Sequence, residues 1–144
     1  MLLTVRGAST AAKVLAVLTL AGCGGDDGGA DPVEGPAKDV AAAVDALEQA
    51  TAARDFDRIC RDLLSEAVRA QAGGPDCPAL LRRTSADLRD PRIRVERIQM
   101  KGARATVRVR TRARGQADAP DVIELVREDG RWRVAALGAR ADED

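Results

Sequence analysis

The sequence contains no histidine and no tyrosine, and it has only one phenylalanine and one tryptophan among its 144 residues. Histidine is the commonest general base and the commonest protein ligand for metal ions, so its absence removes the usual means of acid–base catalysis and metal binding. The near absence of aromatic rings also removes the platforms on which nucleic-acid bases stack. We therefore predict no catalytic residue, no metal site and no cofactor.

An excess of charge of one sign is absent too. The sequence has 23 basic and 23 acidic residues, which gives a formal net charge of zero. Such a chain has no bulk attraction to nucleic acid or to anionic lipid. We therefore predict that nucleic acid is not a partner.

Near the N-terminus, the apolar run of residues 14–21 follows Arg6 and Lys13 and ends just before Cys23. A helix that spans a membrane needs about 20 apolar residues, so this run is too short. A basic front, a short apolar run and small residues at its end are typical of a secretory signal peptide. We predict a signal peptide over residues 1–22.

The last residues of this segment read "LAGC" and resemble the lipobox of bacterial lipoproteins. The resemblance implies that the sulfur of Cys23 carries a diacylglyceryl group and that the leader is cut off before it. The protein would then be exported and anchored on the outer face of the bacterial cell membrane. Two acyl chains, at about 0.8 kcal/mol per buried methylene, suffice for stable anchoring. The alternatives are an ordinary signal peptide with a chance cysteine, or a spanning anchor.

Residues 23–36 are rich in glycine, aspartate and proline and have no apolar periodicity. Such a segment cannot bury enough apolar surface to offset the entropy that ordering costs. We predict a flexible tether over 23–36, one domain over 37–139 and a short tail over 140–144.

The first part of the domain has helical periodicity. Apolar residues recur at helical spacing over 37–54, 55–71 and 78–88, which predicts three helices. Asp55 is suited to cap the second stretch and Ser65 to interrupt it by capping a short following turn. Pro36 is suited to the first helical position, where its missing N–H costs nothing.

The second part alternates with the period of a β-strand, over 92–100, 103–114, 121–127 and 131–137. In the first of these strands the apolar parity changes near Glu96, which predicts a β-bulge. The pair Asp129-Gly130 predicts a two-residue hairpin turn. That turn would place residue 125 opposite 134 and residue 123 opposite 136.

Helices followed by strands predict an α+β domain with about three helices packed on a four-stranded antiparallel sheet. The segments "RDFDRICRDLLS" and "EDGRWRV", within 37–138, resemble the nuclear transport factor 2-like superfamily. The resemblance implies a cone in which a curved sheet wraps a helix and leaves a pocket at the open end. Members of the superfamily include isomerases, cyclases and dehydratases, ligand-binding proteins, and proteins that mediate association.

With Cys23 lipidated, two cysteines remain, Cys60 and Cys77. Export exposes the domain to an oxidising environment, so we predict a disulfide between them. The alternative is two buried free thiols. A catalytic thiol is disfavoured because no histidine exists to activate it.

An arginine stripe projects from one face of the predicted sheet. It comprises Arg104, Arg108, Arg110, Arg112 and Arg114, joined by Arg92, Arg94, Arg131 and Arg133 on neighbouring strands. The stripe is either a site for an anionic partner or a solvated outer face balanced by Glu124 and Glu128.

The inward positions of the strands carry alanine, valine, isoleucine, leucine and Trp132, and no carboxylate is assigned to the interior. Trp132 either lines a pocket or is part of the core. We predict a non-enzymatic, membrane-anchored envelope lipoprotein that binds a protein partner, including a second copy as a homodimer, or a small apolar ligand. The alternative is an isomerase or hydratase that uses an interior carboxylate of the cone.

Overall fold

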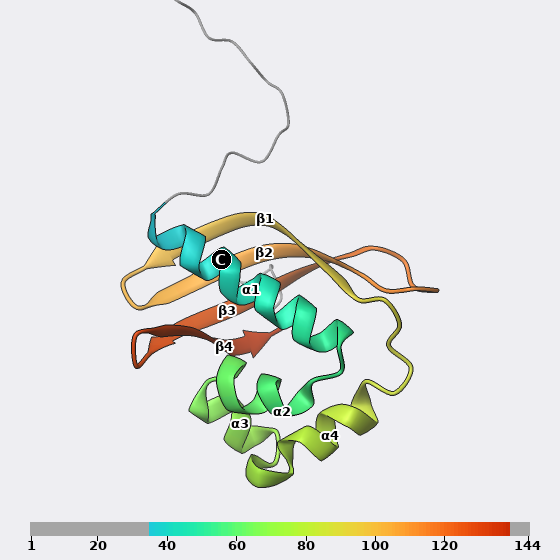
Figure 1. Ribbon diagram of the computed structural model, residues 1–144. Coiled ribbons are helices and arrows are strands. Elements are labelled where there is room, and N and C mark those ends of the chain that lie inside the picture. The colour runs from blue at the N-terminus through green and yellow to red at the C-terminus, as the bar shows by residue number, and fades with distance from the viewer. Residues whose placement is uncertain (1–34, 139–144) are drawn as a thin grey trace, which may run out of the picture.

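The computed structural model describes residues 35–138 and confirms an α+β architecture, with helices packed on one four-stranded antiparallel sheet in the order β1-β2-β3-β4. Figure 1 shows α1 lying across the inner face of the curved sheet, with α2, α3 and α4 gathered below it. The helices are α1 (Pro36–Ala52), α2 (Phe56–Arg58), the π-helix η1 (Ile59–Leu63), α3 (Glu66–Gln71), the 3₁₀-helix η2 (Gly74–Asp76) and α4 (Cys77–Thr84). The strands are β1 (Arg92–Lys101), β2 (Arg104–Arg112), β3 (Ala119–Glu128) and β4 (Arg131–Leu137).

Helix α1 supplies the central element of the core, as its apolar spacing predicts. Its buried face consists of Val40, Val44, Leu47 and Ala50, which pack against the sheet. Burying each of the larger of these side chains is worth about 1.5–3 kcal/mol. Pro36 stands at the start of the helix, as predicted, so α1 begins inside the segment that the sequence assigned to the tether.

The predicted break in the second helical stretch is confirmed. The side chain of Asp55 accepts a hydrogen bond from the main-chain N–H of Arg58 at 3.1 Å, and that of Ser65 accepts from the N–H of Val68 at 3.2 Å. Between these caps the chain forms η1, and Leu64 then becomes extended and makes a parallel bridge to Val134 of β4. The bridge joins the helical layer to the edge of the sheet.

Helix α4 ends at Thr84, before the end at residue 88 that the sequence predicted. The hydroxyl of Thr84 bonds back to the carbonyl oxygens of Leu80 and Leu81. The guanidinium of Arg54 donates to the carbonyl oxygens of Ser85 and Leu88, so a distant side chain satisfies two carbonyl groups at and beyond the end of the helix.

The sheet contains the predicted bulge, between Val95 and Arg97. The turn at Asp129-Gly130 is confirmed as well, with the positive φ angles of 50° and 75° that a type I′ turn requires. Leu125 faces Val134 as expected.

The predicted pairing of residue 123 with 136 is wrong, because Ile123 faces Leu137. Leu125 pairs with Val134 and Glu124 pairs with Ala136, so Ala135 is an extra residue on β4. This second bulge shifts the register of the last part of the strand by one residue.

The disulfide between Cys60 and Cys77 is confirmed, with Cα atoms 6.1 Å apart. It ties η1 to the start of α4, and both cysteines belong to the buried core. Cys23 and the predicted signal peptide lie outside the described residues, as do residues 23–34 of the tether and residues 139–144. Within residues 35–138 no helix is long and apolar enough to cross a membrane.

Candidate ligand cavity

An apolar cavity of about 270 Å³ lies between the helices and the inner face of the sheet, at the C-terminal end of α1. Its lining includes residues of α1, α2, η1, α3 and α4 and of all four strands. Its apolar walls are formed mainly by Leu47, Phe56, Ile59, Leu64, Val68, Leu81, Ile93 and Ile123. The cavity is the kind of space that the cone architecture is expected to leave at its open end.

Four polar residues share the lining: Thr51, Ser85, Thr111 and Asp121. The hydroxyl of Thr51 donates to the carbonyl oxygen of Leu47 at 2.6 Å, and that of Thr111 donates to the carbonyl oxygen of Ala119 at 3.3 Å. These hydroxyls are therefore committed to the protein's own backbone. Asp121 is the one charged side chain of the lining.

Asp121 occupies an inward position of β3. It pairs with Val109 of β2, and the next inward pair is Ile123 with Val107. One of its carboxylate oxygens, Oδ1, accepts a hydrogen bond from the N–H of Val122 at 2.7 Å. No carboxylate was predicted in the interior, although the alternation Asp121, Ile123, Leu125 contains the signal that places Asp121 there.

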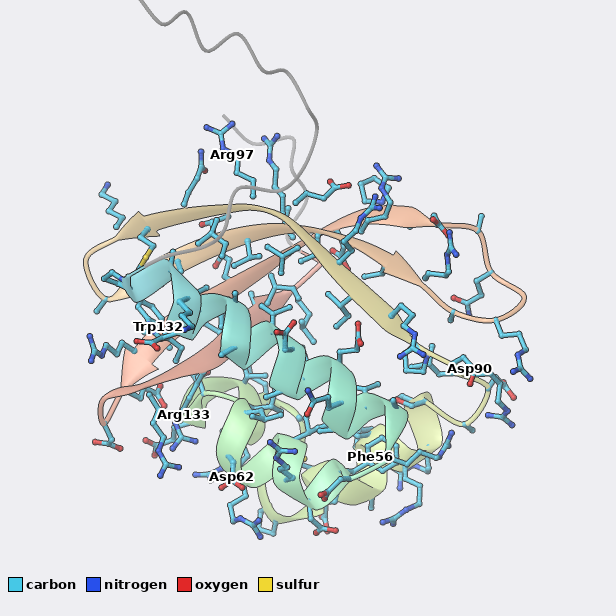
Figure 2. All side chains as sticks on the ribbon, turned by 45° about the horizontal axis from the view of Figure 1, so that its top comes forward. Phe56, Asp62, Asp90, Arg97, Trp132 and Arg133 are labelled. Carbon is cyan, nitrogen blue, oxygen red and sulfur yellow. A yellow bond between two sulfur atoms is a disulfide. The ribbon has the colours of Figure 1, made fainter. Side chains whose placement is uncertain are left out.

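Trp132, the aromatic candidate for ligand binding, lies in the core and is not part of the cavity lining. It pairs with Arg127 near the β3–β4 turn. Figure 2 shows Trp132 well apart from the cavity-lining Phe56, which lies among the helices below the sheet.

Most members of the arginine stripe are exposed and paired with carboxylates. Arg110 donates to Glu96 at 3.0 Å, and Arg94 lies 3.7 Å from the same carboxylate. Arg112 forms two hydrogen bonds with Asp118, at 2.7 and 2.8 Å, and this pairing lowers the pKa of the Asp118 carboxyl. The predicted acidic partners, Glu124 and Glu128, do not pair with this part of the stripe, although Glu128 lies 3.8 Å from the guanidinium of Arg133.

Arg133 does not belong to the solvated face on which the sequence placed it, because its side chain is only 16% exposed. Its guanidinium donates to the carbonyl oxygens of Arg61 and Asp62, at 3.1 and 3.2 Å. Strand β4 is the edge of the sheet, and η1 ends beside it through the bridge between Leu64 and Val134. Arg133 therefore serves as a side-chain cap for the end of η1, and Figure 2 shows it directed toward Asp62.

No group of three or more potential metal ligands occurs among residues 35–138. Around the cavity, the structure instead brings together apolar side chains and the carboxylate of Asp121. The candidate site is therefore a binding cavity with one carboxylate.

Comparisons with known proteins agree with the architecture. Residues 79–137, which include most of α4 and all four strands, match a family described as "Putative lumazine-binding". The match supports the nuclear transport factor 2-like fold that the sequence suggested. No curated protein matches this chain.

The fold is also similar to the solution structure of RPA3114, a SEC-C motif containing protein from Rhodopseudomonas palustris. The two chains are 23% identical, with a TM-score of 0.51, over 69% of this chain and 77% of the other. At this level of identity the likeness concerns the fold alone.

Proposed function

We propose that this protein is a lipid-anchored envelope protein whose domain binds a small apolar ligand without chemical conversion. The observation that carries the proposal is the cavity of about 270 Å³ between helices and sheet. Ligand sites are typically concave and mostly apolar, with few polar groups to fix orientation. The lining has this composition.

The volume sets the size of the ligand. An apolar cavity of about 150 Å³ accommodates benzene, so a cavity nearly twice as large suits a molecule of on the order of ten non-hydrogen atoms. Leu137, which also lines the cavity, is 57% exposed. A ligand that leaves the cavity partly open to solvent would cover apolar surface of Leu137 and gain about 25 cal/mol per Å² buried.

A protein partner has less support. The two large apolar residues exposed on the described surface are Met100 and Leu137, which stand on β1 and β4. These strands are the opposite edges of the sheet, so the two residues do not form one patch.

The matched family's description names lumazine, a flat and polar heterocycle. Two of the four polar side chains in the lining are bonded to backbone carbonyls, which leaves few groups for a ligand with many hydrogen-bonding atoms. We therefore expect a mainly aliphatic molecule such as 1-octanol to bind more tightly than lumazine.

One observation favours the enzymatic alternative: Asp121 is an interior carboxylate of the kind that an isomerase or hydratase would use as a base. Such a reaction also needs a donor that stabilises developing negative charge. Among the described residues, the hydroxyls of Thr51 and Thr111 donate to the backbone instead, and no second charged side chain lines the cavity. Binding without conversion is therefore the proposal.

The test is titration calorimetry of 1-octanol with a chain that begins at Gly24. This chain keeps all residues that build the described core. The variant Ala72→Leu adds three carbon atoms to the cavity lining, and we expect it to weaken binding at least tenfold. Ala67→Leu makes the same change at an exposed position of α3 and should leave binding unchanged. Equal affinity of both variants would contradict binding in the cavity.

The anchor is a proposal that depends on the sequence "LAGC" at residues 20–23. Labelled fatty acid should enter the full chain in a bacterial host, and Cys23→Ala should abolish both the labelling and the removal of the leader. The substitution Ser9→Ala serves as a control within the predicted leader. Undiminished labelling of the Cys23→Ala chain would refute the anchor.

A further inference from the structure

Asp121 places a carboxylate on one wall of an otherwise uncharged cavity. Asp121 pairs with Val109 and lies two residues before Ile123 on β3. Its side chain is therefore on the same inner face of the sheet as that of Ile123. All other side chains of the lining are apolar or carry a hydroxyl. The cavity therefore has one negative charge within otherwise uncharged walls.

The carboxylate has unused capacity for hydrogen bonding. An ionised carboxylate accepts at two oxygens, each with two lone pairs. Among residues 35–138, the hydrogen bond that Asp121 receives comes from the N–H of Val122 to Oδ1, and no arginine or lysine forms an ion pair with it. By contrast, the carboxylates of Glu96 and Asp118 are each paired with an arginine.

Asp121 also stands near the end of the sheet. A Cβ atom built on Gly138 would lie 3.8 Å from Oδ1 of Asp121, and the N–H of Gly138 donates to the carbonyl oxygen of Val122 at 3.1 Å. Leu137, the exposed residue of the lining, directly precedes Gly138. The carboxylate therefore lies on the same side of the cavity as its exposed apolar residue.

We infer that the ligand of this cavity is an aliphatic or cyclic apolar molecule with one protonated amine, and that Asp121 binds the amine. This inference rests on the proposed function and names the chemical class of its ligand. An ammonium group donates charge-assisted hydrogen bonds to the free oxygen of Asp121, while the apolar body fills the space between α1 and β3. An apolar ligand with a carboxylate would meet a like charge and is excluded.

The expected preference is moderate because Asp121 is only half-buried. We expect octylamine to bind about tenfold more tightly than 1-octanol, which corresponds to about 1.4 kcal/mol. Octanoate should bind at least tenfold more weakly than 1-octanol. Each of the three probes has eight carbon atoms, and they differ in the head group. The ranking of their affinities therefore reports the charge of the site.

The experiment measures the affinity of all three probes by calorimetry, at neutral pH and low salt, for the chain from Gly24 and for Asp121→Asn. Asparagine keeps an oxygen that can accept from the N–H of Val122, so the fold should be retained. We expect the variant to bind octylamine and 1-octanol equally, with the affinity for 1-octanol unchanged. Asp45→Asn removes the same charge at an exposed position of α1 and should preserve the tenfold preference.

The outcomes separate this inference from the function on which it rests. If 1-octanol binds but octylamine gains nothing, or if Asp121→Asn keeps the preference, the role of Asp121 is refuted while the cavity stands. If no probe binds, the proposed function fails and the inference with it. Arg140→Gln removes the arginine that follows Gly138 by two residues in the sequence. A preference for octylamine that appears only in this variant would show that Arg140 takes the place of the amine, and it would overturn the inference.

Discussion

The guanidinium of Arg133 donates to the carbonyl oxygen of Asp62 across 71 residues of sequence, at 3.2 Å. Together with the bond to the carbonyl oxygen of Arg61, this contact fixes the end of η1 to the edge strand of the sheet. The π-helix thereby remains beside β4, and Leu64, which follows it, is held in the cavity wall.

Removal of this contact should destabilise the domain. We expect Arg133→Met to lower the free energy of unfolding by about 1–2 kcal/mol, because hydrogen bonds to a charged group are lost and the two carbonyl oxygens lose their partner. Arg131→Met, on an exposed arginine of the same strand, should change it by less than about 0.5 kcal/mol. Urea unfolding followed by the fluorescence of Trp132 measures both. Equal effects would show that Arg133 is only a surface residue.

The disulfide should contribute substantially to stability. Cys60 and Cys77 close a loop with a sequence separation of 17, for which the chain-entropy model gives about 3 kcal/mol. We expect the double variant Cys60→Ala/Cys77→Ala to unfold at correspondingly lower urea concentration. Addition of a reductant should destabilise the unsubstituted chain by a similar amount and leave the double variant unaffected. A reductant effect on the double variant would contradict this explanation.

The pair formed by Arg112 and Asp118 makes stability depend on pH. The hydrogen bond from Arg112 is the main cause that lowers the pKa of Asp118, against a smaller opposing effect of desolvation. A carboxyl whose pKa is lower in the folded state stabilises the fold above its unfolded pKa of about 3.9. This stabilisation is lost as the pH falls through the lower, folded pKa.

Asp118→Asn should therefore be less stable than the unsubstituted chain above about pH 5, and the difference should vanish in acid below the folded pKa. Because the pair is exposed, the difference should also shrink as salt is added. Unfolding curves across this pH range measure the effect, and a carbon-detected NMR titration gives the pKa of Asp118 directly. A difference that persists unchanged in acid would refute the linkage.

The arginine stripe should not bind membranes strongly. Arg110 and Arg112 are already paired, with Glu96 and Asp118, and exposed pairs of this kind neutralise one another locally. We expect no salt-sensitive co-sedimentation of the chain from Gly24 with anionic vesicles. The triple variant Arg108→Gln/Arg110→Gln/Arg112→Gln should behave identically. Binding that the triple variant loses, by about 1 kcal/mol for each arginine, would make the stripe a docking site.

Much of the fold follows from local patterns in the sequence. The bulge near Glu96 and the turn at Asp129-Gly130 were predictable because each depends on a few adjacent residues. The caps Asp55 and Ser65 were predictable for the same reason. The disulfide was predictable from the expectation of export and from the two cysteines that remain besides Cys23.

The features that could not be predicted depend on distant parts of the chain. Helix α4 ends early where Arg54 contacts the carbonyl oxygens of Ser85 and Leu88, more than 30 residues away. The bulge at Ala135 has no signal in a strand that reads as regular. Asp121 was overlooked for a different reason: the alternation places it inward, but a carboxylate is not expected there unless a cavity is known to exist.

The central claim is that a small apolar ligand occupies the cavity between α1 and β3. The most direct test is the measurement of intermolecular nuclear Overhauser effects between 1-octanol and the methyl groups of the chain from Gly24. We predict effects to Leu47 and Ile123, whose side chains line the cavity, and none to Met100, which is exposed on the far edge of the sheet. Effects confined to Met100 and other exposed methyl groups, with none to Leu47 or Ile123 at saturation, would contradict the account.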